Sequence, residues 1–191
     1  MKPEIDIFYP ETINDWRKWL IANSDIKQAV WVVFYKQASG FPSITWSDAV
    51  DEALCFGWID SKKIKIDDQK SHHYFSKRKP NGTWSKINKD KIKKLFLENK
   101  MAVSGLQSVE QAKKNGSWNL LDDVEDLILP DDLQLAFENE PAAFHFYRTL
   151  SKSNKKNILL WMVMAKLPET RLKRINTIIE CALQNKKPPH L

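Results

Sequence analysis

The sequence predicts an α+β protein, with a small, mainly antiparallel sheet and helices in its first half and helices alone in its second half. Residues 30–35 are apolar on both faces and rich in β-branched side chains, which indicates a central strand. Residues 58–66 and 71–78 alternate around a turn at 67–70, as a hairpin does. Beyond residue 100 the apolar residues recur at helical spacing instead.

Length and composition fit one compact protein. The chain has 191 residues, of which 42% are hydrophobic, enough to bury a core. We expect an α+β domain with a central hairpin over residues 1–100, and a helical region over residues 101–191 that packs on it as one compact unit.

Membrane and secretion signals are absent from the pattern. No apolar run approaches the roughly 20 residues that a membrane span needs, and the first residues lack the apolar centre of a signal peptide. Cys55 and Cys181 lie inside predicted helices without paired spacing, which is typical of reduced, buried thiols. We therefore expect a cytoplasmic protein with no membrane partner.

Local signals mark the ends of the first helices. Thr12 is a candidate N-cap with Asp15 as its capping-box partner, and Thr45 stands in the same relation to Asp48. The second of these helices should stop at Gly57, where a left-handed backbone is needed and glycine adopts it without strain.

The hairpin carries the first candidate site. Alternation from residue 58 to 66 puts Asp60 on the same face as Ile64 and Ile66, which marks that face as inward. If Ile66 pairs with residue 71 or 72, Asp60 lies opposite Lys77 or Arg78. An Asp60–Arg78 contact is then either a fixed ion pair or half of an anion-binding site.

The helix that follows the hairpin should cover about residues 89–99, with either Asn88 or Ser85 as its N-cap. In both cases a helix N-terminus, which favours anions, lies beside a basic hairpin. Further helices are expected to start at Ser104 or Ser108, Pro130, Pro141, Ser153 and Pro168, the one after Ser153 being apolar all round and buried.

The charge is strongly segregated along the chain. Residues 61–100 carry 13 basic and 4 acidic side chains, whereas residues 122–140 carry 8 acids and no base. The basic middle suits phosphate or nucleic acid, but it equally suits docking on the chain's own acidic segment or simple solvation of lysines. Only 5 of the 30 basic residues are arginine, which favours the latter readings over a nucleic-acid surface.

Six short motifs resemble the YdeI/OmpD-associated family, also described as bacteriocin-protection proteins. They follow in the family's order and spacing over nearly the whole chain: Phe56-Gly57-Trp58-Ile59-Asp60-Ser61, Arg78-Lys79-Pro80, Trp84-Ser85-x-x-Asn88, Met101-x-x-x-Gly105, Ala112-x-x-x-Gly116-x-Trp118 and Glu169-Thr170-Arg171-x-x-Arg174-Ile175. The resemblance implies a fold and no particular reaction.

Motifs for catalysis and cofactors are missing. The chain has no nucleotide-binding glycine loop, no paired Cys-x-x-Cys and no nucleophile elbow, so we expect no cofactor. His72 and His73 are adjacent on a strand and point to opposite faces, a poor arrangement for a metal, and none is expected. Asp60 beside an arginine would have a lowered pKa, which argues against a general base.

Three functions remain after this reading. The first is a binding or stress-protection protein that holds an anionic small molecule in a basic, tryptophan-lined site, made of Trp58, Asp60, Ser61, Arg78, Lys79, Trp84, Ser85, Asn88 and Trp118. The second is weak, non-specific nucleic-acid binding by the lysine-rich helix and hairpin. The third is a hydrolase or transferase that uses Asp60. Nothing in the sequence indicates the oligomeric state.

Overall fold

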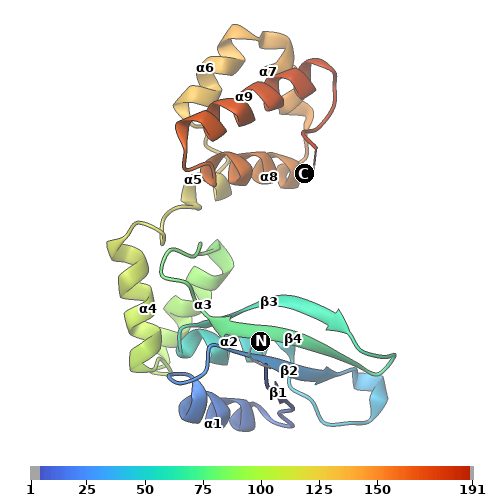
Figure 1. Cartoon of the computed structure of the whole chain (residues 1–191), viewed down its shortest axis with the longest axis vertical. Helices are drawn as coiled ribbons and strands as arrows, with labels where there is room; N and C mark the ends of the chain where they lie inside the picture. Colours follow the sequence, from blue (N-terminus) through green and yellow to red (C-terminus); the bar gives the residue numbers. More distant parts are fainter. Residues whose placement is uncertain (1–4, 190–191) are drawn as a thin grey trace. The chain divides into compact units, whose positions relative to one another are not determined.

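The computed structural model describes residues 5–189 of the chain (Figure 1). The chain divides into two compact units, Met1–Trp118 and Asn119–Leu191. Each unit has its own hydrophobic core, and the α+β class with strands in the first half and helices in the second is confirmed.

The N-terminal unit is a four-stranded sheet with helices. Its elements are β1 (Ile7–Phe8), α1 (Ile13–Asn23), β2 (Ala29–Tyr35), the short 3₁₀ helix η1 (Gln37–Ser39), α2 (Trp46–Cys55), β3 (Trp58–Lys65), β4 (Lys70–Lys77), α3 (Lys86–Leu97) and α4 (Val103–Lys114). The strand order is β1-β2-β4-β3, with β1 parallel to β2 and the other pairs antiparallel. The two-residue β1 had no periodic signal in the sequence and was not predicted.

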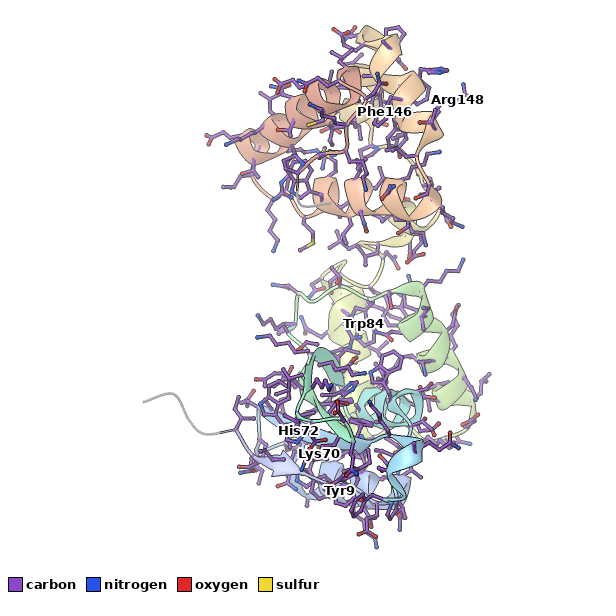
Figure 2. The ribbon with its side chains drawn as sticks, turned by 90° about the vertical axis from the view of Figure 1, so that its right-hand side faces the viewer. Tyr9, Lys70, His72, Trp84, Phe146 and Arg148 are labelled. Carbon is purple, nitrogen blue, oxygen red and sulfur yellow. The ribbon has the colours of Figure 1, made fainter. Side chains whose placement is uncertain are left out.

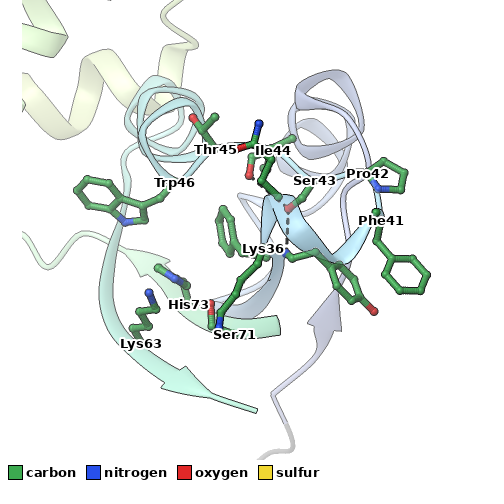
Figure 3. A pocket seen from close by; sticks show the side chains of 14 residues that line it. Lys36, Phe41, Pro42, Ser43, Ile44, Thr45, Trp46, Lys63, Ser71 and His73 are labelled. Carbon is green, nitrogen blue, oxygen red and sulfur yellow. Dashed lines mark hydrogen bonds between the residues drawn. The ribbon is translucent and has the colours of Figure 1, made fainter. Parts of the chain in front are cut away.

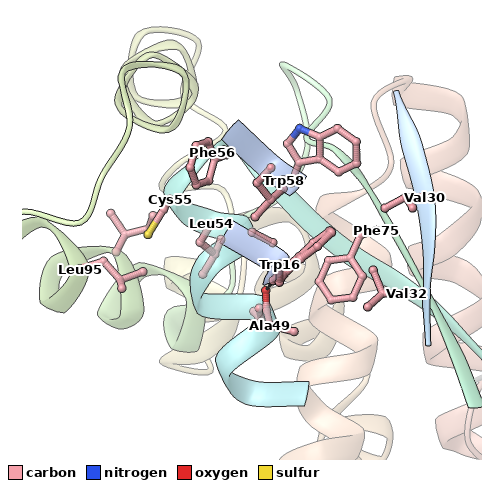
Figure 4. Close-up of a cluster of buried hydrophobic side chains, with 14 of the residues drawn as sticks. Trp16, Val30, Val32, Ala49, Leu54, Cys55, Phe56, Trp58, Phe75 and Leu95 are labelled. Carbon is pink, nitrogen blue, oxygen red and sulfur yellow. Dashed lines mark hydrogen bonds between the residues drawn. The ribbon is translucent and has the colours of Figure 1, made fainter. Parts of the chain in front are cut away.

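One face of the sheet is packed against α1 and α2 (Figure 4). Trp16 of α1 is fully buried, contacts the Phe75 ring of β4 at 5.4 Å between centroids, and donates its indole N–H to the Ala49 carbonyl of α2 at 3.0 Å. The sheet contributes Val30 and Val32 from β2 to the same core. This contact ties both helices and two strands together and fixes the position of the hairpin.

Helix ends follow the local signals of the sequence. Thr12 and Asp15 form the expected capping box, and the Thr45 hydroxyl accepts from the Asp48 N–H. Gly57 has φ of 73°, the left-handed conformation expected after α2. The backbone of Gly57 then accepts the Arg78 N–H at 2.9 Å, which fixes the exit of β4 beside the end of α2.

The pairing of β3 with β4 differs from the expected register. Asp60 lies opposite Phe75 and not opposite Lys77 or Arg78. Lys77, the last residue of β4, pairs with Trp58. Two local features cause the difference: the turn is tighter, with the Ile66 N–H bonded to the Lys70 carbonyl at 3.2 Å, and a β-bulge interrupts the ladder between Asp60 and Lys62.

The bulge also reverses the expected faces of the outer half of β3. Lys63 lies opposite His73, whose side chain shares the face of Phe75, so Lys63 rather than Lys62 continues the face of Asp60. Ile64 and Ile66 are 42% and 44% exposed, so the inference that they mark an inward face is wrong.

The C-terminal unit contains only helices among its described residues: α5 (Asp122–Glu125), α6 (Asp131–Asn139), α7 (Pro141–Thr149), α8 (Lys152–Val163) and α9 (Pro168–Leu183). Its core gathers apolar side chains from all five, among them Val124, Leu133, Tyr147, Met162 and Ile178. Arg171 links α9 to α6 through two hydrogen bonds to the Asp132 carboxylate, one of them at 2.8 Å.

Two predicted helix starts are wrong: Ala102 precedes α4 in place of Ser104 or Ser108, and Ser151, not Ser153, caps α8. Of the two candidates for the cap of α3, Ser85 and Asn88, the structure has Ser85. Ser85, three residues before Asn88, and Ser151, two residues before Ser153, have the extended backbone that an N-cap requires. α8 is not buried all round, since Leu160 is 38% exposed.

In the described range 5–189, no helix combines the length and the apolar character of a bilayer span.

Candidate functional site

Arg78 and Trp84 form the centre of the predicted basic site. The guanidinium of Arg78 lies 3.6 Å above the centroid of the Trp84 ring, and its Nη1 donates to the Thr83 carbonyl at 3.0 Å. Its Nε is buried without a hydrogen-bond partner. Burial lowers the pKa of Arg78 to about 10, an effect that the charge of Asp60 partly offsets.

Trp118 completes this aromatic cluster. Its ring is tilted against Trp84 at 5.0 Å, and Lys113 places its ammonium 5.4 Å from the Trp118 ring. Figure 2 shows Trp84 inside the N-terminal unit, next to its later helices. Because Trp84 is only 2% exposed, the cluster is packed core in which the cation stacks on the ring, and it leaves no free ring face of Trp84 for a ligand.

Several polar residues predicted for the anion site lie around this cluster. Ser85 is used as the cap of α3, where its hydroxyl accepts from the Asn88 N–H at 3.3 Å. Lys79 is exposed beyond the end of β4, and Asn88 is half-buried in the first turn of α3. The structure therefore brings Arg78, Trp84, Ser85, Asn88 and Trp118 into one region at the start of α3.

Trp58, Asp60 and Ser61 lie elsewhere. Trp58 is fully buried against Trp19 at 5.7 Å and donates its indole N–H to the Ser24 carbonyl at 3.3 Å, so it is a core residue with no open face. Ser61 is exposed at the bulge.

The carboxylate of Asp60 takes a partner that the sequence did not suggest. It accepts a hydrogen bond from the indole N–H of Trp46 at 2.8 Å, while within residues 5–189 no salt bridge joins it to Arg78. The predicted Asp60–Arg78 pair is therefore wrong, because the register places the two side chains three positions apart along β4 and the Arg78 guanidinium turns to Trp84.

The lysines of α3 are largely neutralised by neighbouring acids. Lys91 pairs with Asp51 of α2, Lys93 with Asp90, and Lys94 with Glu98. A helix whose ammonium groups are paired presents a weaker field to a phosphate backbone than its sequence suggests.

A pocket of about 790 Å³ lies at the other end of the hairpin, where α2 begins (Figure 3). Residues 34–37 and 40–46 form its walls, and Lys63, Ser71 and His73 of the hairpin contribute from the sheet. We call this space the sheet-end pocket. Trp46, the partner of Asp60, is one of its walls and is 50% exposed.

The floor of the sheet-end pocket is a continuation of the core face of the sheet. On β4 the side chains of Phe75, His73 and Ser71 share one face, opposite Val30, Val32 and Phe34 of β2. Along that face β4 changes from the apolar Phe75, which belongs to the core, to the polar His73 and Ser71, which line the pocket. Polar side chains on a core-facing surface are the arrangement expected of a ligand-binding floor.

His73 is the most enclosed polar group of this floor. It is 8% exposed, and its ring packs on Phe34 at 4.5 Å between centroids. Burial, and then the charge of Lys63, lower the pKa of His73, while Asp60 acts in the opposite direction. The imidazole is therefore neutral at neutral pH.

Sequence reasoning missed this pocket, although one signal was available. Ser71 and His73 alternate with Phe75 on a strand that enters the core, so they had to share its buried face. The loop that faces them carries no recognisable motif. In the part of the chain that the structure describes, no group of three or more His, Cys, Asp or Glu side chains is arranged to hold a metal ion.

Comparison with known families matches each unit to one family. Residues 8–108 match the family described as "Domain of unknown function (DUF8412)", which covers more than half of the chain. Residues 126–185 match the family described as "Bacteriocin-protection, YdeI or OmpD-Associated" and include the motif at Glu169 to Ile175. No curated protein and no solved structure matches the chain. The chain thus belongs to the family of the domain of unknown function DUF8412, and within its C-terminal unit residues 126–185 match the model of the YdeI or OmpD-associated, bacteriocin-protection family.

Proposed function

We propose that the protein binds a small anionic molecule with a flat apolar body in the sheet-end pocket. The observation that carries the proposal is the change from apolar to polar side chains on the core face of β4, beneath a cavity of about 790 Å³. This volume is in the range of small-molecule sites. The match of residues 126–185 to the bacteriocin-protection family is compatible with a protective role and names no ligand.

The charge of the pocket favours an anion. Among the described residues its lining contains two cationic side chains, Lys36 and Lys63, and no carboxylate. Asp60, whose charge acts on His73, is already hydrogen-bonded to Trp46. An anionic group placed between the two lysines meets a positive field with no acid on the lining to oppose it.

The walls favour a flat apolar body. Trp46 offers a half-exposed indole whose N–H is occupied by Asp60, so its orientation is fixed. On the floor Phe34 lies on the same face as His73 and packs on its ring at 4.5 Å, whereas Tyr35 lies on the other face of the sheet with Phe41 and Tyr9. The indole of Trp46 and the ring of Phe34, held in this way, provide rigid aromatic surfaces for a flat ring.

A matched pair of probes tests the proposal. Naphthalene-2-sulfonate carries a charge that does not titrate, and naphthalene-2-sulfonamide has nearly the same shape without it. We expect the sulfonate to quench or shift tryptophan fluorescence and to bind at least tenfold more tightly than the sulfonamide, which is about 1.4 kcal/mol.

Variants on one strand provide the control. Lys63→Met should weaken sulfonate binding and leave sulfonamide binding unchanged, whereas Lys62→Met should change neither, because Lys62 lies on the other face of β3. Equal binding of the two probes, or equal loss in both variants, would contradict an anion site in this pocket.

A further inference from the structure

His73 holds a position in the sheet-end pocket that the binding of an anion does not by itself require. It lies on the floor between Lys63 of β3 and Ser71 of its own strand, and its ring rests on Phe34 of β2. Within residues 5–189 no hydrogen bond is made to its ring. Both ring nitrogens of this enclosed residue are therefore available to a group inside the pocket.

The charged groups around His73 come from three elements. From β3, Lys63 opposes a positive charge on the ring and Asp60 favours one. From the loop before α2, Lys36 adds a second cation to the lining. From the start of α2, the Asp48 carboxylate accepts from the Thr45 hydroxyl at 2.7 Å, and the Trp46 indole engages Asp60.

Together these groups keep the imidazole of His73 neutral when no ligand is bound. Its enclosure and Lys63 outweigh Asp60, whose carboxylate is hydrogen-bonded to Trp46. A ligand that brings a negative charge to the lysines reverses the balance, because the anion offsets Lys36 and Lys63 and accepts a hydrogen bond from the ring. A protonated imidazole donates from both nitrogens, while a neutral one donates from one.

We propose that His73 takes up a proton when the sheet-end pocket binds its anion, so that the ligand and one proton enter together. This inference rests on the proposed function and adds a regulation to it: acidification tightens binding. The proton comes from solvent, moves to the free ring nitrogen of His73, and returns to solvent when the anion leaves. No bond of the ligand is made or broken.

Calorimetric titration with naphthalene-2-sulfonate between pH 5.5 and 8 measures the coupling directly. The charge of this probe is constant over the range, so any proton uptake belongs to the protein. We expect affinity to rise as the pH falls, by at most about tenfold per pH unit, the limit for one proton. Repeating the titration in buffers of different ionisation enthalpy should show a net uptake of up to one proton for each sulfonate bound.

Two variants and one resonance assign the proton to His73. His73→Gln should bind the sulfonate with an affinity independent of pH, and His72→Gln should behave as wild type, since His72 lies on the opposite face of β4. In wild type, NMR titration of the His73 ring should give a higher pKa with the sulfonate bound than without it.

The possible results separate the two proposals. Sulfonate binding that is tight and independent of pH, with an unchanged His73 titration, would overturn the proton coupling and leave the proposed function intact. Absence of sulfonate binding at every pH would overturn both. Proton uptake that persists in His73→Gln would assign it to another group and would also refute the inference.

Discussion

The indole N–H of Trp46, the first residue of α2, donates to the carboxylate of Asp60 on β3 at 2.8 Å. The bond links a wall of the sheet-end pocket to the edge strand of the sheet across 14 positions in sequence. It also explains why a carboxylate stands on the helix-covered face of β3 without an ion pair.

Removing this acceptor should loosen the wall of the pocket. Asp60→Ala leaves the Trp46 indole without its partner, and we expect a loss of about 1 kcal/mol in stability, below the roughly 1.5–3 kcal/mol typical of a hydrogen bond to a charged group because the pair is partly exposed. Asp60→Asn keeps an oxygen acceptor and should lose less. Urea denaturation and the fluorescence anisotropy of Trp46 measure both effects. Identical values for the two variants would show that the bond does not hold the indole.

Arg78 should matter through its ring contact and not through a carboxylate. Arg78→Met keeps an apolar chain on Trp84 and removes a buried charge, so we expect a denaturation midpoint close to wild type. Arg78→Lys keeps the charge and loses the planar stack, so it should be the less stable variant, by about 1–2 kcal/mol. A Met variant that is less stable than the Lys variant would point back to an ionic partner.

Gly105 should tolerate no side chain. A Cβ there would stand 2.1 Å from the Cys55 carbonyl oxygen, at the place where α4 approaches the end of α2. We expect Gly105→Ala to cost about 3 kcal/mol or more, the upper end for overpacking, because the obstacle is backbone. Gly40→Ala is the control: its φ is +75° but nothing lies within 4 Å, so the loss should be only the strain of about 1–2 kcal/mol. Thermal unfolding of the two variants compares them, and similar midpoints would mean that α4 shifts to accept the methyl group.

Arg171 and Asp132 should act as a coupled pair in the C-terminal unit. The two hydrogen bonds hold α9 to α6, and Arg171 lowers the pKa of Asp132. Since both side chains are partly exposed, a double-mutant cycle with Arg171→Met and Asp132→Asn should give a coupling energy of about 1 kcal/mol, smaller at high salt. A coupling energy of zero at low salt would leave the arginine of this family motif without a stabilising role.

Stability should fall on mild acidification because of the histidines of β4. Burial lowers the folded-state pKa values of His72 and His73 below 6.5, so the unfolded chain binds more protons as the pH drops through that value. The free energy of unfolding should therefore decrease from pH 7 to pH 5.5, and His73→Gln should remove part of this decrease. Urea titrations at the two pH values test this, and an equal pH dependence in the variant would exclude His73 as a contributor.

The features that could be predicted from sequence are those with local causes. The caps at Thr12 and Thr45 and the stop at Gly57 depend on side chains within three residues of the position they control. The register of the hairpin depends on a bulge that no residue type marks, and the sheet-end pocket depends on a loop that meets β4 only after folding. Arg78 and Trp84 lie together near the start of α3, but the separation of Trp58 from Trp84 and the burial of both could not be deduced from strand alternation alone.

The bulge at Ser61 divides β3 into two halves whose side-chain phases are independent. The inner half, with Trp58, is constrained by the core, while the outer half is free to vary the groups that it offers to the pocket. If Ser61 instead paired with Tyr74 and the bulge were lost, Lys62 and Ile64 would replace Lys63 and Lys65 on the pocket face without moving Trp58. A shift of register at this bulge is therefore a route by which the groups offered to the pocket can change while the fold is kept.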